Sequence, residues 1–180
     1  MSAHESMEHA EHAEHASGEN KKIALLIAVI ALCLSLSEML GKGAQTESIA
    51  KNVEASNLWA FFQAKTIRIT VLTTAAEQMQ IEADRATEAD LKARLTKNID
   101  GWKKNAARYE DDPASKEGRK QLMARAQEAE HQRDEALSRY HQYEIASAAF
   151  QIGIVLASAE VITGMAVLGW LSGLLGLAGL

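Results

Sequence analysis

Residues 145–180 read IASAAFQIGIVLASAEVITGMAVLGWLSGLLGLAGL, a run of 36 residues in which Glu160 is the only charged side chain. A helix that crosses a bilayer needs about 20 predominantly apolar residues, so this run exceeds one span. Five glycines occur in its second half, which favours a turn and close helix packing. We expect a transmembrane helix over 145–164 and a second short transmembrane or re-entrant helix over 165–180. The alternative is a single long span that ends in an apolar tail.

A second apolar run lies near the N-terminus. Lys21 and Lys22 open it, and residues 23–37 contain no charged side chain. The run is long enough to span a bilayer. A signal peptide is disfavoured because the run starts late and no clean small-residue cleavage site follows it before Glu38. The sequence therefore predicts a transmembrane helix over 21–40.

The segment between the two apolar runs, residues 41–144, has a different composition. Gly41 and Gly43 favour an interruption of the helix where this segment begins. Residues 43–144 hold 16 Lys/Arg and 17 Asp/Glu, so the segment is nearly neutral and polar. Apolar residues recur in it at steps of three and four, the spacing of an amphipathic helix with coiled-coil tendency. The first part of this seam consists of Leu58, Phe62, Ile69, Leu72, Ala76, Met79 and Ala83.

Asp111-Asp112-Pro113 breaks the helical pattern, which predicts an antiparallel, coiled-coil-like helical hairpin with its turn near 111–115. The two arms are unequal, because residues 44–110 precede the break and only residues 116–144 follow it. Either the first arm folds into two pieces, or its early part lies along the membrane. A bend near 98–101, at Asn-Ile-Asp-Gly, is one way to shorten it.

The composition of the whole chain supports an all-α membrane protein. Its 180 residues include one proline, one cysteine and nine aromatic residues, too few turn and aromatic residues for a β-sandwich or barrel. A single cysteine, Cys33, excludes an intrachain disulfide framework. The formal net charge of -5 and the lack of a basic patch argue against a nucleic-acid partner.

Residues 1–20 form a polar tail with a Glu-His-Ala repeat. The tail has too little apolar area to offset the entropy of ordering, so we expect it to be disordered in isolation. His9, His12 and His15 are metal-ligand candidates because imidazole binds Zn²⁺, Ni²⁺ and Cu²⁺. The alternative is a solvated acidic tail without a ligand.

Glu160 is the outstanding residue of the apolar runs, because an ionisable group inside a span marks a functional site by default. Fifteen residues separate it from Ile145, or about 22 Å along a helix. This distance places Glu160 at the membrane face on which Lys21 and Lys22 open the first span. We predict an interfacial ion pair between Glu160 and one of these lysines, with a turn cap and an ion or proton pathway as alternatives.

Two further groups are predicted contact sites. Trp59, Phe61 and Phe62 place three aromatic rings within four residues, which indicates an interfacial or oligomer-contact helix, with ordinary core packing as the alternative. Small residues that repeat every three or four positions let helices approach closely in lipid. The second predicted oligomer contact therefore consists of Gly169, Gly173 and Gly176.

Four strings of sequence occur together in this chain: NVEASNLWAFFQAKTIR (52–68), ARYE (107–110), EGRK (117–120) and IVLAS (154–158). On the basis of these strings, the chain over about residues 20–180 resembles the bacterial membrane-protein family called domain of unknown function 4337. The resemblance implies a small bacterial membrane protein with an N-terminal span, a helical middle and a C-terminal apolar region. It implies no known activity and no catalytic residues.

The sequence predicts no enzyme and no cofactor, because it has no nucleophile elbow and no phosphate-binding glycine loop. The alanine-rich seams bury little apolar area within one chain. We therefore expect a self-associating structural or scaffold protein of the bacterial inner (cytoplasmic) membrane, with membrane lipid and further copies of itself as partners. The alternatives are an oligomeric ion or proton channel that uses Glu160, and a regulatory membrane subunit that binds another protein. The central segment is predicted to be cytoplasmic from the positive charges of Lys42, Lys51, Arg133 and Arg139.

Overall fold

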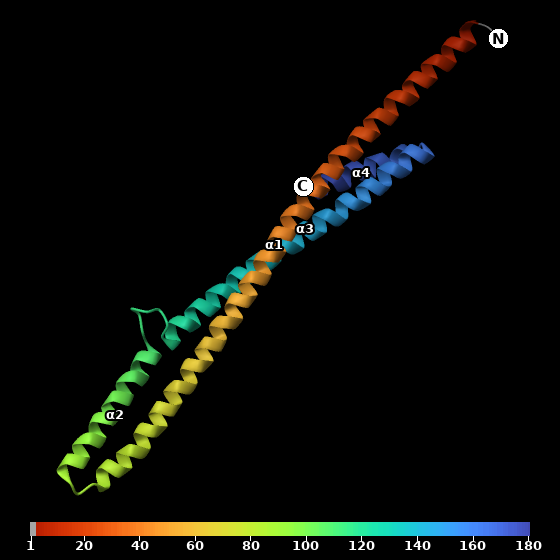
Figure 1. Cartoon of the computed structure of the whole chain (residues 1–180). Helices are drawn as coiled ribbons and strands as arrows, with labels where there is room; N and C mark the ends of the chain where they lie inside the picture. Colours follow the sequence, from red (N-terminus) through yellow and green to blue (C-terminus); the bar gives the residue numbers. More distant parts are fainter. Residues whose placement is uncertain (1–2) are drawn as a thin grey trace. The chain divides into compact units, whose positions relative to one another are not determined.

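The computed structural model describes the backbone of residues 3–180 and the side chains of residues 21–180. No strand occurs over residues 3–180, so the all-α prediction is confirmed there (Figure 1). The elements are α1 (Ala3–Arg85), α2 (Ala89–Glu110), α3 (Arg119–Thr163) and α4 (Ala166–Ala178). The chain divides into two compact units, which we call unit 1 (Met1–Thr46 with Ala136–Leu180) and unit 2 (Glu47–Glu135).

The polar tail over residues 1–20 falls on residues whose side chains are not described. The same holds for His9, His12 and His15. The disorder predicted for this tail and its metal site therefore remain predictions.

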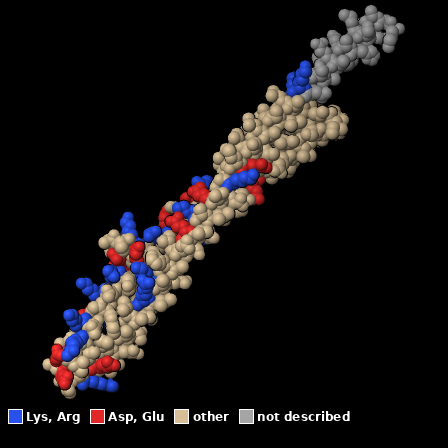
Figure 2. Space-filling model, in the orientation of Figure 1, with Lys and Arg blue, Asp and Glu red and all other residues tan. Residues whose placement is uncertain are grey.

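Unit 1 contains the apolar parts of the chain. Lys21–Arg85 of α1 and Arg119–Thr163 of α3 each include a window long and apolar enough to cross a membrane, and α4 is a shorter apolar helix. The drawn face of unit 1 in Figure 2 has a wide band without acidic or basic side chains, and residues 23–37 and 145–159 contain none. Large apolar side chains point outward on this unit; Leu25 is 67% exposed and Ile162 is 85% exposed.

Within unit 1, α4 runs back along α3 (Figure 1). The connection passes through Gly164, whose φ of 69° lies in the left-handed region that favours glycine. The Ser172 hydroxyl donates a hydrogen bond of 2.8 Å to the Gly153 carbonyl, and Ser172 is fully buried. Because residues 153 and 172 lie on opposite sides of the turn, this bond joins two antiparallel helices.

The interruption predicted at Gly41 and Gly43 is wrong, because α1 continues through both residues. A Cβ at Gly41 would lie 3.3 Å from the Tyr143 Cβ, tighter than an ordinary contact. The glycine thus lets α1 and α3 approach each other closely in unit 1. Nearby, the Ser37 hydroxyl donates a 3.0 Å hydrogen bond to the Tyr143 carbonyl. Contacts between helices outweigh the cost of about 1 kcal/mol that glycine imposes on a helix.

Unit 2 is held together by two apolar clusters along α1. In one, Leu122 of α3 is fully buried against Ala55 and Leu58 of α1. In the other, Ile99 of α2 is 1% exposed and packs against Ala76 and Ala83 of α1. The predicted seam of α1 thus faces α2 in its later part and α3 in its earlier part.

The order of these contacts corrects the predicted hairpin. As the chain advances from Ile99 to Leu122, its partners on α1 move back from Ala76 and Ala83 to Leu58 and Ala55. Both α2 and α3 therefore run antiparallel to α1, and the chain reverses at residues 86–88. The break near 111–115 falls in the connection between α2 and α3, where the helix is interrupted without reversal. A proline ends a helix, but it does not set the direction of the next one.

The first arm therefore folds into two pieces, but not at the predicted bend. Residues 98–101 lie inside α2, and a Cβ at Gly101 would meet nothing within 4 Å. Within this helix, Ile99 is buried against Ala76 and Ala83. Reversal at residues 86–88 also gives arms of more similar length, which removes the difficulty that the sequence posed.

Candidate functional site

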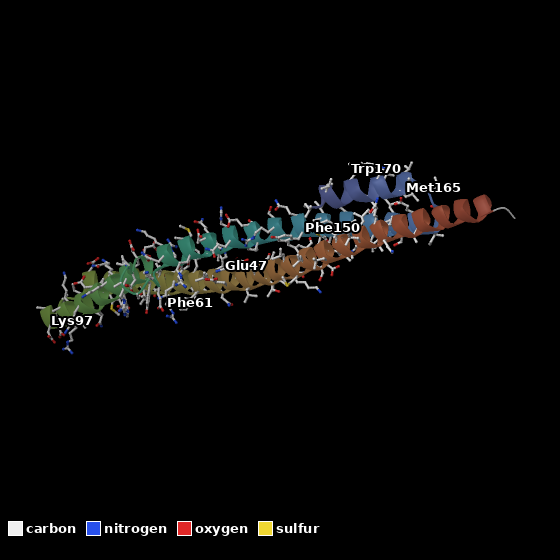
Figure 3. All side chains as sticks on the ribbon, turned by 90° about the horizontal axis from the view of Figure 1, so that it is seen from above. Glu47, Phe61, Lys97, Phe150, Met165 and Trp170 are labelled. Atoms are coloured by element: carbon white, nitrogen blue, oxygen red, sulfur yellow. The ribbon has the colours of Figure 1, made fainter. Side chains whose placement is uncertain are left out.

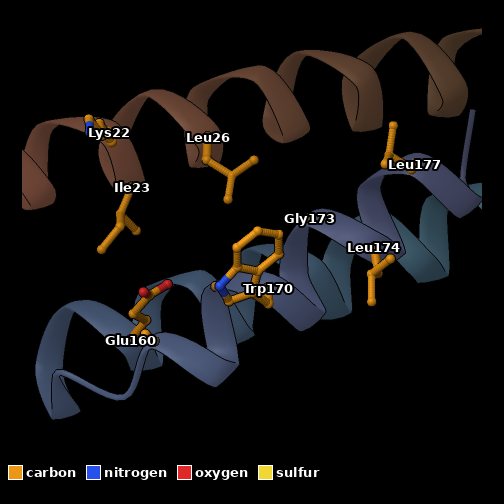
Figure 4. A pocket seen from close by; sticks show the side chains of 10 residues that line it. Lys22, Ile23, Leu26, Glu160, Trp170, Gly173, Leu174 and Leu177 are labelled. Atoms are coloured by element: carbon orange, nitrogen blue, oxygen red, sulfur yellow. The ribbon is translucent and has the colours of Figure 1, made fainter.

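Unit 1 has a cavity of about 550 Å³, open on one side, between the start of the described part of α1, the end of α3 and α4. This volume lies within the range of small-molecule sites, about 300–1,000 Å³. Most of its wall is apolar, with Leu26 from α1 and Trp170, Leu174 and Leu177 from α4 (Figure 4). The charged side chains in the wall are Lys22 and Glu160.

Glu160 reaches this cavity from the last turn of α3. Its Oε2 atom is buried and has no hydrogen-bond partner, the only such side-chain atom among residues 21–180. A Cβ at Gly169 would overlap the carboxyl group, so the glycine on α4 makes the room that Glu160 occupies. Most buried polar atoms in proteins have a partner, and a buried acceptor without one is costly. Because Oε2 is covered by Gly169, a donor in the cavity can reach the carboxyl group only through Oε1.

The predicted ion pair concerns the same cavity. Lys22 lies on α1 across the cavity from Glu160 (Figure 4), whereas Lys21 is not part of the wall. Among the side chains of residues 21–180, no ion pair joins Glu160 to either lysine. The structure thus brings Lys22 and Glu160 to one cavity, and the direct pair remains a prediction.

The three glycines of the predicted oligomer contact have different surroundings. Gly169 adjoins Glu160, and a Cβ at Gly176 would lie 3.4 Å from the Ile30 side chain, so both serve packing within the chain. Gly173 has open space, because a Cβ there would meet nothing within 4 Å, and it lines the cavity. An oligomer contact through this surface remains a prediction.

The three clustered aromatic residues do not share one environment, because successive positions of a helix point to different faces. Trp59 donates a 2.9 Å hydrogen bond from Nε1 to Glu130 Oε1, and its ring packs edge-on against Phe62 at 5.3 Å. Both rings adjoin the cluster around Leu122. Phe61 is 44% exposed and lies on the outer side of α1 (Figure 3). Trp59 and Phe62 are therefore partly buried against the core of unit 2, and an interfacial or oligomer contact at the three aromatic residues remains a prediction.

The sequence analysis missed an exposed apolar stripe on α1 in unit 2. Its five β-branched side chains are each 54–63% exposed. We call this set the α1 stripe, and it consists of Ile49, Val53, Ile67, Val71 and Ile81.

Helical spacing aligns these residues on one face. Ile49 and Ile67 are 18 residues apart, as are Val53 and Val71, and 18 residues make five turns of an α-helix. Ile67 lies nine residues, or two and a half turns, from Ala76 of the seam. The α1 stripe therefore lies opposite the seam that packs inside unit 2. The charged residues of this stretch fall on its other faces, and they are Lys51, Glu54, Lys65, Arg68 and Glu77.

The signal for the α1 stripe was present in the sequence. A helix with one apolar face is expected to bury that face, but α1 repeats apolar residues on a second face as well. Once the seam of α1 packs against α2 and α3, the apolar side chains on its opposite face have no partner within unit 2.

The connection between α2 and α3 carries the perturbed acids of unit 2. The Gln121 side chain donates a 2.6 Å hydrogen bond to Asp111 and lowers the pKa of that carboxyl group, with a further contribution from Lys120. Hydrogen bonds from the backbone and side chain of Ser115 lower the pKa of Asp112. Asp111 is exposed and Asp112 is half-buried, and their hydrogen bonds hold the connection together locally.

The described residues thus make an all-α chain with two helices long and apolar enough to span a membrane. The profile of the family described as domain of unknown function (DUF4337) matches residues 19–180. The chain belongs to this family, as its resemblance predicted. Comparison with curated proteins and with solved structures gave no match.

Proposed function

We propose that this chain is a membrane-anchored scaffold that assembles with copies of itself through the α1 stripe. The observation that carries the proposal is the set of five exposed β-branched side chains, aligned on a helix face without charged residues. Ser56, Gln63, Thr74 and Gln78 lie between these residues on the same face, so the apolar side chains alternate with polar ones that carry no charge. Exposed apolar side chains that recur on one helix face are typical of a helix that packs against a partner. Unit 2 lacks the all-round apolar surface that contact with lipid would require, because its other faces carry charged side chains.

The apolar helices of unit 1 supply the anchor. Exposed apolar side chains such as Leu25 and Ile162 are unfavourable in water and favourable in contact with lipid acyl chains. We place the anchor in the bacterial inner membrane, with unit 2 in the cytoplasm, from the family resemblance and the positive charges near the span ends.

A second copy is the favoured occupant of the α1 stripe for a geometric reason. Copies that insert into the membrane in the same direction are related by a symmetry axis along the membrane normal. Their α1 helices therefore run parallel, and equivalent residues lie opposite each other. β-branched side chains in such parallel seams favour dimers when they alternate with leucine, and larger oligomers in other patterns. The α1 stripe contains only isoleucine and valine among its five members, a composition that fits a parallel seam between identical helices.

Cysteine cross-linking in native membranes tests the proposal. In a Cys33→Ser background, Ile67→Cys places a thiol on the α1 stripe, and Thr73→Cys places one on another exposed face of the same helix. We expect mild oxidation to link copies through position 67 much faster than through position 73. Equal rates at the two positions would refute self-association through the α1 stripe.

The other two functions predicted from the sequence are outcomes of related measurements. Cross-links from position 67 to a different protein, without links between copies, would favour a regulatory subunit. A cation conductance in vesicles that depends on Glu160 would favour the channel. Either result would replace the scaffold proposal.

A further inference from the structure

We propose that the cavity in unit 1 binds a membrane phospholipid whose head group carries a primary ammonium, with that ammonium on Glu160. The inference rests on the membrane insertion proposed above and does not depend on self-association. Its starting point is the Glu160 carboxyl group, which lines an open cavity and whose Oε2 atom has no hydrogen-bond partner within the chain.

The charges of the cavity match such a head group. Glu160 on α3 offers an acceptor for an ammonium, and Lys22 on α1 offers a donor for a phosphate. A phospholipid head with a primary amine carries both groups on one short chain. Hydrogen bonds between charged partners are about twice as strong as neutral ones, and a membrane interior weakens competition from water.

The apolar wall matches the rest of the lipid. Leu26, Trp170, Leu174 and Leu177 extend the cavity along α1 and α4, where an acyl chain would lie. Trp170 is 76% exposed and lies on the side of α4 away from α3 (Figure 3), so lipid reaches the cavity from the bilayer. The open space at Gly173 adds width that a side chain would remove.

A quaternary ammonium provides the discriminating comparison. A choline head has the same phosphate and a similar charge, but its nitrogen has no N–H to donate to Glu160. A glycerol head has no ammonium. The cavity should therefore select the primary amine over both, by about tenfold for one charge-assisted hydrogen bond. Lys22 contacts the phosphate that all three share, so it adds affinity without selectivity.

Trp170 reports the occupant. The full chain is reconstituted in vesicles that contain a small fraction of one phospholipid with brominated acyl chains, which quench tryptophan at short range. The head group of the brominated lipid is ethanolamine, choline or glycerol, and all else is matched. We expect the ethanolamine lipid to quench at about a tenfold lower mole fraction than the other two. Trp170→Phe should remove this difference, because Trp59 and Trp102 lie in unit 2.

Two variants and one control test whether the lipid preference arises at this cavity. Glu160→Gln keeps the shape of the side chain and removes its charge, so the ethanolamine preference should be lost. Gly173→Leu fills the cavity without meeting another atom at its Cβ, and it should also abolish the preference. Glu38→Gln is the matched control, because Glu38 lines a different pocket of unit 1. Circular dichroism confirms that each variant remains helical.

The outcomes separate this inference from the proposed function. Equal quenching by all three lipids, or a preference that survives both Glu160→Gln and Gly173→Leu, overturns the lipid site alone. Loss of the preference in Glu160→Gln but not in Gly173→Leu places the ammonium outside the cavity and also overturns it. No quenching by any lipid would show that Trp170 does not contact lipid and would overturn the lipid site, whereas the α1 stripe is tested separately by cross-linking.

Discussion

Replacement of Ile67 by serine tests the α1 stripe quantitatively. Ile67 is 63% exposed and lies opposite the seam, so Ile67→Ser removes an apolar surface without opening the core of unit 2. Full burial of an isoleucine side chain contributes about 1.5–3 kcal/mol. Burial of the part that is exposed here therefore contributes about 1–2 kcal/mol per copy.

A symmetric contact loses this contribution twice, or about 2–4 kcal/mol for a pair of copies. At about 1.4 kcal/mol for each factor of ten, the dissociation constant should rise by about 30- to 700-fold. Energy transfer between donor- and acceptor-labelled full-length copies, measured in vesicles as lipid dilutes the protein, gives this constant.

Leu91→Ser is the matched control for this measurement. Leu91 on α2 is 44% exposed and lies outside the α1 stripe, so the same kind of change should leave the dissociation constant within about threefold of the wild-type value. If Ile67→Ser and Leu91→Ser shift the constant equally, the contact does not run through the α1 stripe. If Ile67→Ser lowers helicity instead, the residue belongs to the core and the reasoning from its exposure fails.

Three further predictions concern unit 2. Leu122→Ala should destabilise it by about 2–5 kcal/mol, because it opens a cavity at a fully buried site; denaturant unfolding followed by helicity measures the loss. The lowered pKa values of Asp111 and Asp112 stabilise the folded state above the ordinary carboxyl value of 3.8, and this contribution should disappear as the pH falls through the lower folded values. Asp111→Asn should weaken that pH dependence, and an unchanged acid unfolding profile would refute the assignment. A protease site inserted after Ala114 should be cut while the protein keeps its helicity, since the connection is exposed there; unfolding on insertion would show that the connection is part of the core.

Local features of the sequence were sufficient for the helical class, the apolar runs and the seam of unit 2. Pro113 and the two aspartates before it predict a helix break, because the backbone conformations that they favour disrupt a helix within a few residues. The seam is equally local, since a repeat of three and four positions fixes which side chains share a helix face. Leu58, Ala76 and Ala83 accordingly lie where their spacing predicted.

The direction of the chain after each break required the tertiary structure. Residues 86–88 contain neither proline nor glycine, so no local signal marks the reversal there. The reversal is favoured by the burial of Ile99 against Ala76 and Ala83, contacts between residues far apart in sequence. The fit of the Glu160 carboxyl group against Gly169 likewise depends on how α4 packs on α3.

The sequence alone therefore determines which faces of these helices are apolar, because side-chain direction repeats with the helical turn. It does not determine which apolar face is buried within the chain and which is left for a partner. On α1, Ala76 and Ile67 both lie on faces with apolar residues. Because α2 packs against the face of Ala76, that residue is buried and Ile67 on the opposite face stays exposed. That choice depends on contacts summed over the whole fold, to which distant residues contribute as much as neighbours.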